Sequence, residues 1–347
     1  MTQTIDRKEF LDLLTKVSIG IAQKEMIEQS ASFIFTSKKG HNSVHAFNNE
    51  IFATINTNVK LNAAVEAQPL LDVLKKIKSK TVDIWTEDDE LRIEAKGSDN
   101  GIKMDKKIAL AIDDINIPEK FTKVQENFSD LCRLACLTAG HTMDEPLLLN
   151  VNLSSKEIQS CDNDRITICK LDKSMKLTAL IPATNLKKIV TNKIIGIYKE
   201  NAWIHFKAEG GLILSTGILE EDFIDVNKFI PDEDGEKLTL PNEIGSILDR
   251  ANIFSKDTIS NERVVHIHLT SQKKGLLVIS SRNESGWSNN DARTKYKGPD
   301  LNFMINADFL KDILQITNTI HIVDDVILFQ DEATLHMVKL EGEEEEE

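Results

Sequence analysis

The stretch PLLDVLKKIKSK, residues 69–80, decides the fold because the chain repeats its pattern twice more. Apolar residues recur in it at spacings of three and four, which predicts a short amphipathic helix. The same spacing returns in TNLKKIVTNK (184–193) and ADFLKDILQIT (307–317). The leucines that align, at separations of 115 and 124 residues, are Leu71, Leu186 and Leu310. Solenoid repeats are much shorter than this, so each copy is expected to be a domain.

A second helix and a hairpin accompany each of these segments. Helical spacing also occurs, at intervals of about 115 to 120 residues, in segments 6–21, 127–140 and 242–255. Alternating apolar and polar residues, which predict strands joined by polar turns, occupy 81–97, 195–216 and 320–340. We therefore expect an α+β fold of three tandem copies of one module, each with two helices and antiparallel sheets.

The module boundaries are expected near residues 122 and 236. The second boundary lies in IPDEDGEK (230–237), whose Asp, Glu, Gly and Pro residues are typical of a linker. The terminal EGEEEEE carries charges of one sign, which predicts a disordered acidic tail. The predicted domains are 1–122, 123–235 and 236–340, and the tail covers 341–347.

The composition limits the class of protein. The 347 residues carry a formal net charge of -14, with 41% hydrophobic and 28% charged residues. This excludes a wholly disordered chain and allows a nucleic-acid partner only if the basic residues gather on one surface. No apolar run is long enough to cross a bilayer and no signal-peptide pattern is present, so we expect a cytoplasmic protein.

Common catalytic motifs are absent from the sequence, including the P-loop, the GxGxxG dinucleotide loop and the GxSxG elbow. His266 and His268 alternate on an expected strand, but no third metal ligand accompanies them. Buried free thiols are expected for Cys132, Cys136, Cys161 and Cys169. We therefore expect no catalytic residue, no metal and no cofactor.

The turn SCDNDRIT (160–167) gathers carboxylates between two expected strands. Asp162 and Asp164 are two residues apart, which does not show the separation across a substrate that a glycoside hydrolase needs. An EF-hand loop would need glycine where Thr167 stands. A polar turn that another molecule recognises is favoured, and a hydrolase using Asp162 and Asp164 stays open.

Basic residues occur on every expected helix, although the chain as a whole is acidic. The acids concentrate in strand and loop segments such as TEDDE, LEEDF and PDEDGE. One interpretation is that the helices line a concave surface and contact DNA phosphates without reading bases. The other is that they are ordinary solvated helix faces. The helix cations in question are Lys75, Lys76, Arg133, Lys187, Lys188, Arg250 and Lys311.

The ordered set of motifs resembles a known family. SCDNDRIT is similar to the ATDGHRLA signature of the bacterial DNA polymerase III beta subunit, the sliding clamp. IPATNLKKIV (181–190) resembles the family's Ile-Pro-x-Lys helix start, and LNFMINADFLKDIL (301–314) resembles its asparagine-led last helix. PLLLNVNL (146–153) is similar to a strand with a Leu-Asn-Gly turn. The resemblance runs in the correct order over residues 1–340.

The resemblance implies a processivity factor with no chemistry of its own. Two chains would join head to tail into a ring of six domains, with helices lining a pore for duplex DNA. DNA polymerase, the clamp loader and other proteins would be tethered through a hydrophobic pocket for short peptides. Weak, non-specific phosphate contact suits this role, because tight base readout would stop sliding.

The resemblance also implies site residues. Lys24 and Lys75 match family residues that contact DNA, and the expected DNA-binding set is Lys24, Lys75, Lys76, Arg133, Lys187, Lys188, Arg250 and Lys311. The partner-peptide pocket would use Leu149, Arg165, Ile166, Pro231, Val338 and Leu340. The dimer contact would pair two residues of one chain, Ile102 and Met104, with two of the other, Ile253 and Phe254.

The chain departs from the family at several positions. Asn163 and Asp164 replace the Gly and His of the signature, and residues 221–226 replace a Gly-x-Phe-Pro-x-Tyr run. These changes indicate a divergent member, with a phage origin as one interpretation. Two alternatives remain, a clamp-fold scaffold that binds peptides without encircling DNA, and the hydrolase at Asp162 and Asp164.

Overall fold

A computed structural model describes residues 2–38, 40–112, 114–141, 143–232, 235–256, 263–271 and 275–342. The chain forms two compact units, each with helices packed on antiparallel sheets. Unit 1 comprises Met1–Arg133 and Met175–Glu221. Unit 2 comprises Leu134–Ser174 and Asp222–Glu347.

Unit 1 begins with a strand that leads directly into a helix. β1 (Gln3–Asp6) ends at Asp6, whose Oδ1 accepts the backbone N–H groups of Lys8 and Glu9 at 2.9 and 3.0 Å. This N-cap satisfies two donors that a helix start leaves free, and α1 (Arg7–Val17) follows. The apolar face of α1 buries Phe10, Leu14 and Val17.

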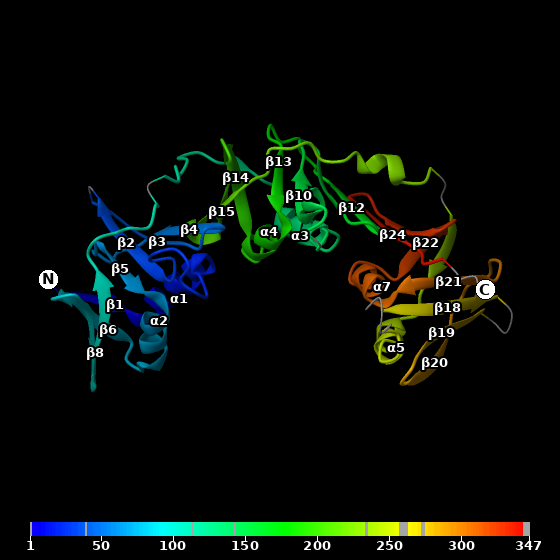
Figure 1. Cartoon of the computed structure of the whole chain (residues 1–347), viewed down its shortest axis with the longest axis horizontal. Coiled ribbons are helices and arrows are strands. Elements are labelled where there is room, and N and C mark those ends of the chain that lie inside the picture. The colour runs from blue at the N-terminus through cyan, green and yellow to red at the C-terminus, as the bar shows by residue number, and fades with distance from the viewer. Residues whose placement is uncertain are drawn as a thin grey trace. The chain divides into compact units, whose positions relative to one another are not determined.

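Helix α2 (Ala67–Lys76) lies beside α1 in unit 1 (Figure 1). Its Leu70 and Leu74 are fully buried, while Lys75 and Lys76 occupy the exposed last turn. Burying a leucine stabilises the fold by about 1.5–3 kcal/mol, so spacing of the apolar residues fixes which face turns inward. The lysines are thereby turned toward solvent.

Unit 1 contains a continuous sheet of 12 strands in the order β1-β6-β7-β8-β5-β2-β3-β4-β16-β15-β14-β9. Its first half has β2 (Ser32–Lys38), β3 (His41–Phe47), β4 (Ile51–Asn56), β5 (Ala63–Glu66), β6 (Thr81–Glu87), β7 (Glu90–Ala95) and β8 (Ser98–Asp105). Its second half has β9 (Thr122–Lys123), β14 (Ile194–Glu200), β15 (Trp203–Ala208) and β16 (Ile213–Gly217). The halves join where Ile51 pairs with Thr216.

Two further helices belong to the middle copy of the predicted repeat. α3 (Phe128–Ala135) extends across the boundary between the units in the sequence, and α4 (Ala183–Ile189) follows β13 (Ala179–Pro182) in unit 1. In α4, Leu186 and Ile189 are fully buried while Lys187 and Lys188 are exposed. The module predicted over 123–235 is therefore divided between the two units, and the three-domain division stays a prediction.

Unit 2 contains strands in the order β10-β11-β12-β24-β23-β22-β17 and a second sheet in the order β20-β19-β18-β21. The first set comprises β10 (Asn150–Leu153), β11 (Glu157–Cys161), β12 (Arg165–Lys170), β17 (Glu236–Thr239), β22 (Thr319–Val323), β23 (Val326–Gln330) and β24 (Thr334–Lys339). The second comprises β18 (Val264–Thr270), β19 (Leu276–Asn283), β20 (Gly286–Arg293) and β21 (Leu301–Asn306). The helices of unit 2, α5 (Ile244–Ala251) and α7 (Ala307–Leu314), contact each other.

The pairing of β12 with β24 positions the site described below. Arg165 pairs with Val338 and Ile166 pairs with Met337, so successive pairs point to opposite faces of the sheet. Ile166 and Met337 join an apolar cluster that the segment containing Val226 covers. Val338 joins the core beneath α5 and α7 on the other face. β24 therefore contributes to two separate cores, and β12 contributes to one of them.

The structure confirms the helices predicted from the repeat, since each predicted segment contains one. It also confirms that the four cysteines are buried and form no disulfide, and burial raises the pKa of the Cys161 and Cys169 thiols to about 12. Among the described residues, no helix combines the length and apolar character that a membrane crossing requires. In the predicted tail, the N–H of Glu341 donates to the carbonyl of Met304, and residues 343–347 lie outside the described residues.

Candidate functional site

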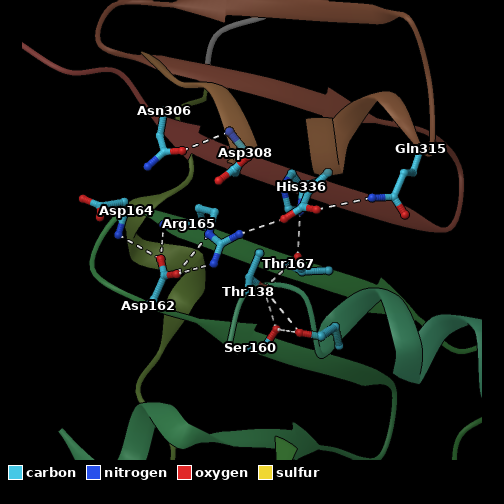
Figure 2. Close-up of polar contacts among 12 residues, drawn as sticks. Thr138, Ser160, Asp162, Asp164, Arg165, Thr167, Asn306, Asp308, Gln315 and His336 are labelled. Atoms are coloured by element: carbon cyan, nitrogen blue, oxygen red, sulfur yellow. Dashed lines mark hydrogen bonds and ion pairs between the residues drawn. The ribbon is translucent and has the colours of Figure 1, made fainter. Parts of the chain in front are cut away.

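The turn between β11 and β12 is held by its first aspartate. Asp162 Oδ1 accepts the backbone N–H groups of Asp164 and Arg165 at 3.0 and 2.6 Å (Figure 2). The N–H of Asp162 also donates to the carbonyl of Arg165, which closes the hairpin. An aspartate that hydrogen-bonds the backbone two or three residues ahead is a common way to fix a tight turn. The local sequence therefore fixes the conformation of this turn.

Arg165 is buried and fully engaged by its neighbours. Its side chain is 4% exposed, and its Nε and Nη2 donate to Asp162 Oδ2 at 3.0 and 2.8 Å. Nη1 donates to Asp312 Oδ2 on α7 at 3.0 Å, and the guanidinium lies 3.9 Å from the centroid of the Phe309 ring. A planar guanidinium can donate to two carboxylates in its plane while its face stacks on a ring. Arg165 thus ties β12 to α7.

A chain of buried polar groups lies next to Arg165 (Figure 2). The Thr138 and Ser160 hydroxyls share a hydrogen bond of 2.6 Å, and Thr138 donates to Thr167 at 2.9 Å. The Thr167 hydroxyl lies 2.8 Å from His336 Nδ1. Burial, with a smaller contribution from Arg165, lowers the pKa of His336 to about 3, so its imidazole is neutral at physiological pH.

Asp164 differs from Asp162 because its carboxylate is half-buried and turns away from the hydrogen bonds of the turn. Burial and the neighbouring Asp162 raise the pKa of its carboxyl group. Its carbonyl accepts the N–H of Lys339, which connects the turn to the end of β24. Both aspartates therefore have structural roles here, and the geometry gives the hydrolase interpretation no paired carboxylates facing a common substrate.

The helix cations that were expected to contact DNA fall into two groups. Lys24, Lys75, Lys76, Lys187 and Lys188 are exposed residues of unit 1. The other three are engaged within the chain: Arg133 with Asp130 at 2.6 Å, Lys311 with Asp249 at 2.6 Å, and Arg250 with Asn290 at 2.8 Å. The structure therefore places seven of the eight on helices and Lys24 in the segment between η1 (Ser18–Gly20) and β2, and three of the eight are hydrogen-bonded to neighbouring side chains.

The four residues expected at the dimer contact differ in how far their side chains are exposed. Ile102 and Met104 on β8 are each 4% exposed, because they face the core of unit 1. Ile253, just after α5, is 67% exposed. Phe254 is partly buried, and a methyl group at Gly286 would lie 2.8 Å from its ring. Of these four residues, only Ile253 has a large apolar side chain that is exposed.

An apolar surface that the sequence analysis did not identify lies on the segment before β17. Val226 and Ile230 of this segment pack on the sheet, whereas Phe229 and Ile224 are 61% and 38% exposed. A groove of about 140 Å³ lies beside it, with Ile168, Ile230 and Leu335 among its apolar lining residues and Glu157, Lys170 and Asp331 among its polar ones. A cavity of this size accepts one ring or branched side chain.

Comparison with solved structures identifies the architecture. The chain matches the crystal structure of a DNA polymerase sliding clamp from Bacillus subtilis with a TM-score of 0.81 at 16% identity, covering 99% of both chains. The chain has the sliding-clamp fold. A griselimycin-bound DnaN sliding clamp from Pseudomonas aeruginosa matches with a TM-score of 0.80 at 16% identity over 99% of both chains. The DNA polymerase III beta subunit from Thermotoga maritima gives 0.79 at 15% identity, covering 98% of this chain and 99% of that one.

Sequence comparison agrees over the first part of the chain. The family model described as DNA polymerase III beta subunit, N-terminal domain, matches residues 1–116. No curated protein matches the chain in sequence. The resemblance drawn from the motifs is therefore confirmed, in a divergent sequence with the clamp fold throughout its length.

Within this clamp fold, the residues expected to line a peptide pocket do not form one open site. Ile166 lies in the cluster on one face of the sheet, and Val338 and Leu340 lie in the core on the other. Arg165 is engaged as described, and only Leu149 and Pro231 are half-exposed. Side chains alternate between the two faces of the sheet along β12 and β24, and this alternation separates these residues. The face that each residue takes cannot be predicted from the motif unless the register of the two strands is known.

Within the described ranges, no group of three or more His, Cys, Asp or Glu side chains could hold a metal ion. His266 and His268 are both exposed on β18, as their alternation predicts. The Phe229 surface, by contrast, could have been found from the run DFIDVNKFIP, which has more apolar residues than one buried face can hold.

Proposed function

We propose that two copies of this chain form a DNA sliding clamp that encircles duplex DNA and tethers a DNA polymerase and other proteins to it. The observation that carries the proposal is the clamp fold over 99% of the chain, together with the family match over residues 1–116. The role requires no chemical step, and topology rather than base recognition would hold the ring on DNA.

The charge distribution supports DNA as the partner. The chain is acidic overall, yet exposed lysines recur on the helices and at Lys24. Lysine is a flexible point charge, and such cations attract phosphates without sequence preference. A ring that slides needs this kind of contact, because strong base-specific hydrogen bonds would hold it at one place.

Two strand edges support a head-to-tail dimer. β20 is at the edge of its sheet in unit 2. In unit 1, β8 pairs with β7 over Ser98–Lys103 and with β5 only at Met104 and Asp105, so the Ser98–Lys103 stretch has one free edge. Free edges are sites where another chain adds a strand. Ile102 would then contribute from this free edge, Met104 would lie at its end, and Ile253 and Phe254 would supply the apolar contact.

The partner-binding surface would lie around the half-exposed Leu149 and Pro231 and the exposed Ile224 and Phe229. An extended peptide could place one apolar side chain in the groove lined by Ile168 and pack a second on Phe229. Ile166, Val338 and Leu340 would support this surface from below, and Arg165 would fix the turn beside it.

Retention on DNA tests the proposal. The protein is mixed with a linear duplex, onto whose ends a closed ring can thread, and the ends are then blocked with a bulky group. Unbound protein is removed by gel filtration at moderate salt, and the bound protein is measured before and after one restriction cut. Encirclement predicts co-elution with the end-blocked duplex and release after the cut. A clamp-fold scaffold predicts no retention on either form. The hydrolase alternative predicts product formation that an Asp162→Ala variant lacks.

A further inference from the structure

The charged residues of α5 and α7 are paired within unit 2. Lys311 Nζ lies 2.6 Å from Asp249 Oδ1, which joins the two helices. Arg250 Nε donates to Asn290 on β20 at 2.8 Å. Asp312 accepts from Arg165, and Asp308 lies 3.7 Å from Arg263 Nε. Every charged side chain of these helices therefore has a partner that fixes the helix in place.

The net charge of α5 and α7 is also unfavourable for phosphate. Together they carry two basic residues, Arg250 and Lys311, against three acidic ones, Asp249, Asp308 and Asp312. Freeing Lys311 for a phosphate would break its ion pair and leave Asp249 facing the same anion. Because like charges repel, a duplex next to this pair of helices would gain little attraction.

Helices α2 and α4 of unit 1 have the opposite character. They carry four lysines, Lys75, Lys76, Lys187 and Lys188, against a single acidic residue, Asp72. For Lys75, Lys76 and Lys187 no ion pair occurs within the described part of the chain. Lys188 lies 3.9 Å from Glu50, which is too far for a hydrogen bond, and both side chains are more than half exposed, so solvent screens that pair. Arg133 differs, because it is hydrogen-bonded to Asp130 at 2.6 Å and its Nη2 also donates to the carbonyl of Val190 at 3.2 Å.

The lysines of α2 and α4 also lie in the last turn of each helix. Cations in that position interact favourably with the helix dipole, and this interaction alone would explain one lysine at the end of each helix. The dipole does not bury or pair the ammonium groups, however, so they remain available to phosphate. Lys24 is likewise exposed in unit 1.

The geometry points to an uneven phosphate-binding surface, on which Lys24, α2 and α4 hold the duplex while α5, α7 and Arg133 do not contact it. This inference rests on the proposed function and narrows it. Of the eight cations expected at DNA, five would bind phosphate and three would stabilise the chain. Such a surface gives the ring one attractive region per chain and leaves the α5–α7 region without attraction.

Salt dependence of DNA binding tests the inference, because each phosphate contact contributes about 0.9 to the slope of log affinity against log salt. Binding of a short random-sequence duplex is measured by fluorescence anisotropy across a salt series. The triple variant Lys75→Gln, Lys76→Gln, Lys187→Gln should lose about 0.9 of slope for each lysine that contacts a phosphate. The double variant Arg250→Gln, Lys311→Gln should retain the wild-type slope.

A matched control separates contact from net charge. Lys96, Lys120 and Lys173 are exposed lysines on turns and linkers, and their triple Gln variant changes the net charge by the same amount as the α2 and α4 variant. This control variant should keep the wild-type slope of log affinity against log salt. Unfolding in urea checks that each variant remains folded.

The outcomes distinguish the inference from the proposed function. A loss of slope that is equal per residue in the α2–α4 and α5–α7 variants would overturn the uneven surface and leave DNA binding intact. Wild-type slopes in both variants would overturn it too, since phosphate would then bind elsewhere. Absence of binding by the wild-type protein would overturn the uneven surface, whereas absence of retention on the end-blocked duplex would overturn the proposed function.

Discussion

Arg165 and Asp312 are 147 residues apart in the sequence and are joined by a hydrogen bond of 3.0 Å. Arg165 begins β12 and Asp312 lies on α7, so the contact connects a strand of the middle of the chain to a helix near its end. The guanidinium also binds Asp162 and stacks on Phe309. The signature-like turn therefore serves to fix a helix, and its arginine is not free to contact a partner.

Removal of Arg165 is expected to destabilise the protein strongly. Arg165→Ala leaves Asp162 and Asp312 without their cation, and loss of one partner of a buried pair costs about 3–5 kcal/mol. The free energy of unfolding in urea measures the effect. Because both side chains belong to one contact, Asp312→Ala should cost less in the Arg165→Ala background than in wild type. Glu50→Ala, at an exposed ion pair, should change stability by less than about 1 kcal/mol.

Phe229 is expected to affect partner binding and not stability. Its side chain is 61% exposed, so Phe229→Asp removes little buried surface but places a charge on the proposed peptide surface. Capture of a polymerase-derived clamp-binding peptide, measured by calorimetry, should weaken at least tenfold. Ile195→Asp, at another exposed apolar side chain, should bind normally. Equal peptide binding by Phe229→Asp and wild type would show that the partner-binding surface does not include Phe229.

Acid is expected to destabilise the fold through two buried histidines. Burial lowers the pKa of His205 to about 4 and that of His336 to about 3, from 6.5. As the pH falls, these histidines are therefore protonated in the unfolded chain before they are protonated in the folded one. The stability that the neutral histidines contribute is complete above pH 6.5 and is lost as the pH falls toward the folded-state pKa values. Each histidine should cost about 2 kcal/mol between about pH 7 and about pH 5.

Urea unfolding as a function of pH measures that loss. His336→Gln should be less stable at neutral pH and should lose less stability on acidification. His266→Gln, at an exposed position of β18, should follow the wild-type profile. A wild-type free energy of unfolding that is independent of pH over this range would contradict the neutral, buried state of the two imidazoles.

The four cysteines are expected to resist modification in the folded protein. All are buried and none forms a disulfide, and burial raises the pKa of Cys161 and Cys169 to about 12, so little reactive thiolate forms. Titration with a disulfide reagent should detect four thiols in denaturant and almost none without it. Rapid labelling of native protein would show that the cores around these residues open.

The sequence predicts the helices and the strand alternation well, because both depend on local spacing of apolar residues. Val82, Ile84, Leu91 and Ile93 are buried as their alternation indicates. The exposed lysines of α2 and α4 are predictable for the same reason, because the burial of the leucines turns these lysines toward solvent.

The sequence predicts the site less well because the site depends on distant pairings. The register of β12 against β24 sends Ile166 and Val338 to opposite faces, which a list of motif residues cannot show. The burial of Arg165 depends on Asp312, which lies far away in the sequence. Ile224 and Phe229 are exposed apolar residues, and composition alone does not separate such residues from those of the core.

Electron microscopy of the purified protein, without DNA, tests the central claim most directly. We expect class averages of a closed ring with two-fold symmetry and an open centre, formed by two chains of 39.0 kDa, with α2 and α4 facing the hole. An open arc, a filled centre or outward-facing lysine helices would contradict the account.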